Sequence, residues 1–124
     1  MRYLCFVKME EAKADPPAAL MDAMGQHVGE GFASGVLVDA GGLYGVADAI
    51  EFRVSDGAVT VTDGPYAEAK EVIGGWAIIK VDSDEQARAE GQKMADLHVE
   101  HWPTWEGAIE MRRISEPDEA PQGA

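Results

Sequence analysis

Two short segments carry apolar side chains on both alternations of a β-strand, and this pattern restricts the fold more than any other feature. Residues 3–9 read Tyr-Leu-Cys-Phe-Val-Lys-Met, and residues 76–81 read Trp-Ala-Ile-Ile-Lys-Val. A strand that is apolar on both sides is covered on both sides, so both segments are expected to be central strands of a sheet. Any fold for this chain must therefore provide cover for two sheet faces.

Local signals predict two helices around these strands. The first begins with Asp15 as its N-cap and ends at Gly35, because aspartate caps helix starts and glycine caps helix ends. The second begins with Ser83 and Gln86, which fit the capping-box pattern, and ends before Pro103.

A β-hairpin is predicted in the middle of the chain. Residues 50–55 alternate Ile, Phe and Val with polar side chains, the pattern of a strand exposed to water on one face only. Asp56-Gly57 is a strong turn signal, and an alternating strand returns over residues 58–62. A short strand at residues 36–38 and a closing strand at residues 109–114 complete the predicted elements.

The element order, β-α-β-hairpin-β-α-β, predicts an α+β fold. It is a ferredoxin-like βαββαβ arrangement with an added β-hairpin, in which an antiparallel sheet carries both helices on one face. Two helices on one face leave the second face of the two central strands without cover. A second copy of the chain is the simplest cover, so we expect a homodimer with a cleft for a small ligand between its sheets.

Length and charge limit the classes of partner. The 124 residues correspond to one domain, here residues 1–114, followed by a tail at residues 115–124 with no apolar period that we expect to be disordered. A net charge of -13 disfavours nucleic acid and anionic membrane surfaces as partners.

The short N-terminal apolar run fits neither a signal peptide nor a membrane span, so a cytoplasmic protein is expected. The single cysteine, Cys5, is expected to be a small buried apolar residue.

Residues 62–71 contain the most unusual motif, Thr-Asp-Gly-Pro-Tyr-Ala-Glu-Ala-Lys-Glu, which leaves a strand through a sharp turn and becomes charged. One interpretation is a ligand-facing edge, with Asp63 as the first polar candidate. The other is a solvated connection between strands. The candidate ligand-binding residues are Tyr66, Glu68, Lys70 and Trp76.

This motif, together with Gly74-Gly75-Trp76, resembles the DGPF-type proteins of the YCII-related family, with Tyr66 in place of the phenylalanine. The similarity extends from the first strand to the closing Met-Arg-Arg-Ile segment. The resemblance implies a dimeric, ferredoxin-like α/β barrel and no particular activity or cofactor. Asp63 matches the motif aspartate. The histidine that one branch of the family pairs with an aspartate aligns near Met24 rather than His27, so the resemblance does not carry that pair over.

His98 and His101 form the second candidate constellation. They lie three residues apart and therefore on one face of the second helix. Together with a carboxylate from another part of the chain, two such histidines could bind a divalent metal. Alternatively, one of them could exchange a proton near neutral pH. A structural role near the helix end is the alternative, because the helix dipole favours histidine there.

Three functional hypotheses follow. In the first, the protein binds a small organic molecule near the motif and could perform acid–base catalysis. Asp63 would orient or accept a proton, His98 or His101 would exchange one, and Tyr66 and Trp76 would form the walls. The second is a non-catalytic regulatory or protein-binding dimer. The third is a metal-dependent enzyme that uses the two histidines.

Overall fold

The computed structural model describes most of the chain. The described residues are 1–9, 15–65 and 72–118. The elements in chain order are β1 (Arg2–Met9), α1 (Ala18–Ser34), β2 (Leu37–Gly42), η1 (Val46–Asp48), β3 (Ile50–Ser55), β4 (Ala58–Asp63), β5 (Val72–Lys80), α2 (Asp84–His101) and β6 (Gly107–Arg113). Residues 119–124 of the predicted tail lie outside the description, whereas Glu116 pairs with Arg2 at 3.0 Å. No helix in the described ranges is long and apolar enough to cross a membrane.

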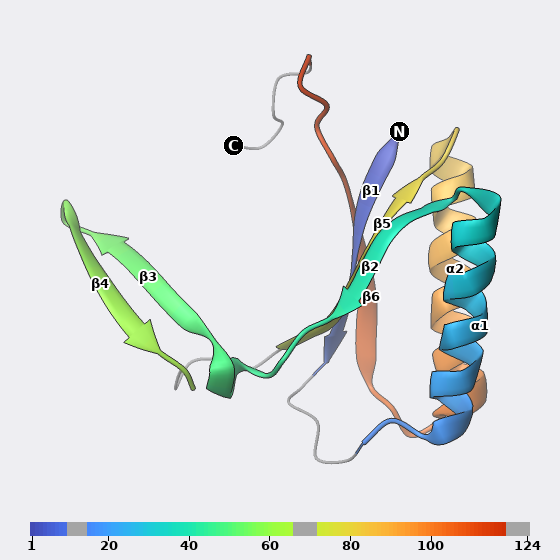
Figure 1. Ribbon diagram of the computed structural model, residues 1–124, viewed down its shortest axis with the longest axis horizontal. Coiled ribbons are helices and arrows are strands. Elements are labelled where there is room, and N and C mark those ends of the chain that lie inside the picture. The colour runs from blue at the N-terminus through green and yellow to red at the C-terminus, as the bar shows by residue number, and fades with distance from the viewer. Residues whose placement is uncertain (10–14, 66–71, 119–124) are drawn as a thin grey trace.

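Four strands form an antiparallel sheet in the order β2-β5-β1-β6. The two predicted central strands, β1 and β5, occupy its centre. Both helices cover one face of this sheet, while β3 and β4 form a separate two-stranded hairpin on its other side (Figure 1). The ferredoxin-like α+β fold with an added hairpin is thus confirmed. We call the four-stranded sheet and its helices the body, and β3 with β4 the arm.

Strand register assigns side chains to the two faces of the body sheet. Cys5 lies opposite Ala77 and Met111, and this row packs toward the helices with the core of Tyr3 and Ile79. The alternate positions belong to the opposite face, because side chains alternate along a strand and paired residues share a face. We call this opposite side the outer face; its central apolar residues are Leu4, Phe6, Trp76 and Ile78, paired as Leu4–Ile78 and Phe6–Trp76.

The capping predictions have different outcomes for the two helices. Ser83 Oγ accepts a hydrogen bond from the Gln86 amide at 3.0 Å, which confirms the predicted start of α2. Gly35 adopts the left-handed conformation (φ 82°) and confirms the end of α1. The prediction that Asp15 caps α1 is wrong, because the helix begins at Ala18 with Pro17 at the N-cap and no side-chain cap. Consecutive prolines explain this, since a residue before proline avoids the helical region.

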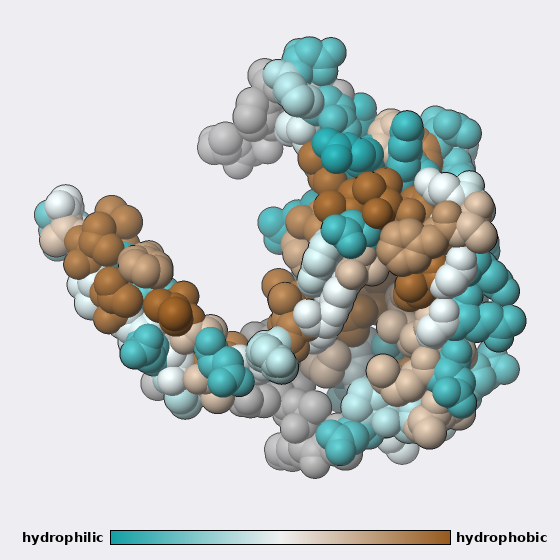
Figure 2. Space-filling view, viewed as in Figure 1, coloured by the Kyte–Doolittle hydropathy of each residue, from teal (hydrophilic) through white to brown (hydrophobic). Residues whose placement is uncertain are grey.

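The arm has one apolar face and one polar face. Its turn residues Asp56 and Gly57 both have positive φ angles, as the predicted Asp-Gly hairpin requires. Cross-strand pairing gathers five apolar side chains on one face, and each is 56–73% exposed: Ile50, Phe52, Val54, Val59 and Val61. The prediction of a strand exposed on one face only is therefore wrong for the single chain. Figure 2 shows apolar surface on the arm and a hollow between the arm and the body.

Candidate functional site

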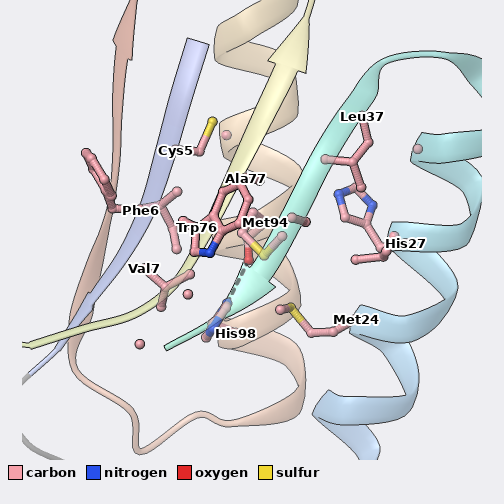
Figure 3. Close-up of a pocket in the computed structure, with 18 of the residues that line it drawn as sticks. Cys5, Phe6, Val7, Met24, His27, Leu37, Trp76, Ala77, Met94 and His98 are labelled. Atoms are coloured by element: carbon pink, nitrogen blue, oxygen red, sulfur yellow. Dashed lines mark hydrogen bonds between the residues drawn. The ribbon is translucent and has the colours of Figure 1, made fainter. Parts of the chain in front are cut away.

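A cavity of about 450 Å³ lies between the helices and the sheet of the body (Figure 3). Both helices and all four strands of the body contribute to its lining, which is mainly apolar. The sheet contributes small residues to this lining, among them Cys5, Ala40, Gly75 and Ala77. Such residues cannot fill the space under two helices, and interiors are otherwise closely packed. The sequence therefore leaves a hollow where a larger side chain would complete the core.

His98 is the buried polar residue of this lining, at 5% exposure. Its Nδ1 lies 2.9 Å from the main-chain oxygen of Met94. A carbonyl oxygen only accepts hydrogen bonds, so Nδ1 must carry the proton and Nε2 must be the acceptor of the neutral ring. No described residue forms a hydrogen bond with Nε2. The ring of Trp105 packs on the imidazole at a centroid distance of 4.4 Å, so the ring is held in place from a second side.

Three further polar side chains contribute to the cavity lining: Cys5, His27 and Glu90. Burial raises the pKa of the Cys5 thiol to about 11, and the negative charge of Glu90 adds to this rise. The thiol therefore stays protonated at neutral pH and is unsuited to act as a nucleophile. The sequence patterns predict no binding role for these three residues. The one sequence feature that could have identified them is their position beside the apolar residues of β1, α1 and α2, because that position directs their side chains toward the space between the helices and the sheet.

The two predicted helix histidines have different environments. His101 does not belong to the cavity lining, and its Nε2 lies 3.8 Å from Glu100 Oε2. Within the described ranges, no group of three or more His, Cys, Asp or Glu side chains is placed to hold a metal ion. The described part of the chain therefore supplies no third ligand for the metal site that the third hypothesis builds on His98 and His101.

Asp63 lies at the end of the arm rather than at the cavity. It is exposed and pairs across the hairpin with Ile50, on the apolar face of the arm. The next residue, Gly64, donates its N–H to the oxygen of Ala49 at 2.7 Å. A Cβ at Gly64 would overlap the main-chain oxygen of Val46, so this glycine allows the chain to pass close to η1. The Asp-Gly part of the motif thus joins the arm to η1.

Of the four residues predicted to bind a ligand, Trp76 lies in the described part of the chain and the other three do not. Trp76 borders the cavity at β5, while strand alternation directs its indole to the outer face, where it lies over Gly41. A Cβ at Gly41 would be 2.9 Å from Trp76 Nε1, which explains the need for glycine there. Tyr66, Glu68 and Lys70 lie outside the described residues. The structure therefore places the buried side chain of His98 at the cavity and leaves Asp63 and His101 out of its lining.

Sequence comparison agrees with this architecture. No curated protein matches the chain. A family model described as the YCII-related domain matches residues 1–116, which include every helix and strand of the body and the arm. Because this match covers nearly the whole sequence, the chain belongs to the YCII-related domain family.

Proposed function

We propose that the protein is a cytoplasmic homodimer that binds a small organic molecule in the helix–sheet cavity of each copy. The observation that carries this proposal is a cavity of about 450 Å³ with the buried acceptor His98 in its lining. Small-molecule sites typically measure about 300–1,000 Å³ and combine apolar walls with a few fixed polar groups. The cavity has both properties.

The residues of the lining favour one chemical class of ligand. Apolar walls favour an apolar body such as an aromatic ring system, and Nε2 of His98 favours one O–H or N–H donor on it. The carboxylate of Glu90 in the lining disfavours an anionic ligand. The best-fitting class is a neutral aromatic alcohol or a similar molecule.

Acid–base chemistry is a natural extension of this binding mode. A neutral imidazole can accept a proton from a bound hydroxyl, and the Met94 carbonyl would stabilise the resulting imidazolium through Nδ1–H. In this proposal His98 takes the proton-exchange role, whereas Asp63 and His101 take none at the cavity.

Binding of naphthol and of its methyl ether, measured by calorimetry, tests the proposal. The ether has the same ring system but no donor, so the wild-type protein should prefer naphthol by about three- to tenfold, the value of one net hydrogen bond. The preference should disappear in His98→Ala and persist in His98→Gln, whose amide oxygen is an acceptor near the position of Nε2. His101→Ala is the matched control and should bind like the wild type. Equal wild-type affinity for both probes would reject the role of His98.

Support for the homodimer comes from the outer face of the body. Leu4, Phe6, Trp76 and Ile78 lie on the side of the sheet that the helices leave uncovered. Contiguous apolar surface of this kind is typical of an interface between subunits. Light scattering over a range of protein concentrations should give twice the mass of one chain. A single-chain mass at every concentration would reject the dimer and leave the cavity proposal intact.

A further inference from the structure

Methionine is concentrated around the helix–sheet cavity. The chain has six methionines, and five of them contribute to the cavity lining: Met9, Met21, Met24, Met94 and Met111. Methionine has an unbranched side chain with three rotatable bonds and a polarisable sulfur, so it can fill spaces of different shapes. Proteins that bind partners of several shapes use such methionine-rich surfaces, because the side chains repack around each partner. The composition of the lining therefore bears on how many kinds of molecule the cavity accepts.

The sheet side of the cavity has one fixed shape under β2 and β5. Four small residues form it, in two cross-strand pairs: Ala40–Ala77 and Gly42–Gly75. We call these four residues the floor. Alanine and glycine have no side-chain rotamers to change, so the floor cannot rearrange around a ligand. Because no long side chain rises from it, the floor suits the face of a planar ring.

The helix side of the cavity carries side chains that can rearrange. Figure 3 shows Met24 of α1 and Met94 of α2 directed toward the space between the helices and the sheet. Both side chains are only half-buried, so neither is packed on all sides. Met111 is held more closely, since its sulfur would be 2.7 Å from a Cβ at Gly91 and thus fills the space that this glycine leaves on α2. Met24 and Met94 are therefore the methionines that can take new rotamers when a ligand enters.

We propose that the cavity is a site of broad specificity, in which the floor and His98 bind a planar ring with one donor and Met24 and Met94 adapt to its outline. This inference rests on the proposed function of the cavity and names its ligands as planar aromatic alcohols of differing outline. His98 is the fixed point, because it is 5% exposed and its ring is held by the Met94 oxygen and by Trp105. The two methionines determine specificity, and their flexibility keeps it low.

Calorimetric titration with the two naphthol isomers and with phenanthrol tests the breadth. Each probe has a planar ring system and one O–H group, but the outlines differ. The three wild-type affinities should agree within about fivefold, because methionine repacking offsets the differences in shape. In a Met24→Ile/Met94→Ile double variant they should differ by about tenfold or more, because isoleucine has a similar volume but one strongly preferred rotamer in a helix. Leu97→Ile adds the same side chain to α2 outside the cavity lining and, as the matched control, should keep the wild-type ratios.

Methyl relaxation in protein labelled at the methionine methyl groups gives a second measurement, which needs no variant. In the free protein, the methyl groups of Met24 and Met94 should be more mobile on the picosecond–nanosecond timescale than that of Met111. A bound naphthol should restrict both. Methyl groups of Met24 and Met94 as rigid as that of Met111 in the free protein would overturn the proposal, even where the double variant fails to fold.

The titrations separate this inference from the proposed function. A wild-type protein that binds only one of the three probes, or prefers one by more than about tenfold, would overturn the broad specificity and leave the cavity as a small-molecule site. Unchanged ratios in the folded double variant would overturn the role of the two methionines. Wild-type protein that binds none of the probes would overturn both the breadth and the proposed function.

Discussion

The body and the arm both contain strands with an apolar face, but the chain buries such a face only in the body. In both, antiparallel strands direct a row of apolar side chains to one face, and the central strands of the body carry a second such row on the other face. In the body, the helices cover one face, and Ile79 is only 7% exposed. In the arm, Val61 on the apolar face is 56% exposed. Alternation thus specifies which face needs cover, but the topology of the chain decides whether its own residues provide it.

Truncation of one side chain in each region should produce the largest difference between them. Ile79→Ala removes part of the core and should lower the free energy of unfolding by about 2–5 kcal/mol at any protein concentration. Val61→Ala should change it by no more than about 0.5 kcal/mol in dilute solution, and by more at concentrations where the arm is covered. Urea unfolding at two protein concentrations measures both effects. An equal loss for the two variants in dilute solution would show that one chain already covers its arm.

Thiol labelling should give the next largest contrast. The raised pKa of Cys5, about 11 against an ordinary 9.0, predicts alkylation about a hundredfold slower at pH 8 than for an ordinary thiol. The folded thiol holds its proton more tightly than the unfolded one, so the free energy of unfolding should fall as pH rises from 9 toward 11. A Ser55→Cys variant on the exposed arm, in a Cys5→Ala background, provides the fast reference. Similar iodoacetamide rates for the two thiols would contradict a buried, protonated Cys5.

A single methyl group at the base of the arm should have the smallest effect of the three. Gly64→Ala forces η1 and β4 apart at the Val46 oxygen, which should cost about 1–3 kcal/mol of local stability. Hydrogen exchange should show faster exchange in β3 and β4 and unchanged exchange in β1 and β5. Gly29→Ala is the control, because a Cβ there meets no other atom within 4 Å. Uniformly faster exchange over the whole chain would mean that arm and body unfold as one unit.

Local chemistry made much of the fold predictable from the sequence. The Ser83 cap, the Gly35 helix end and the Asp56-Gly57 turn are each determined by a few neighbouring residues, and the structure has all three. The central position of β1 and β5 followed from their double apolar pattern. The start of α1 was missed because two prolines override the capping preference of Asp15.

The candidate site was less predictable, because it depends on distances between layers. The hollow under α1 and α2 arises from small residues on separate strands, and no local pattern reveals their summed volume. Residue type and motif predict Asp63 at the same site as His98. The topology instead places Asp63 on the arm, outside the cavity lining, and makes Gly64 the residue that joins the arm to η1. His27 and Cys5 carried no motif and were identified only through their position at the cavity.

The hollow in the body also has a consequence for the response to hydrostatic pressure. Unfolding eliminates internal voids, so any part of the cavity of about 450 Å³ that water does not fill makes the unfolded chain the smaller state. Pressure should therefore unfold the body readily, whereas the arm contains no comparable void in its described residues. A molecule that occupies the cavity would remove this volume difference and make the body resistant to compression.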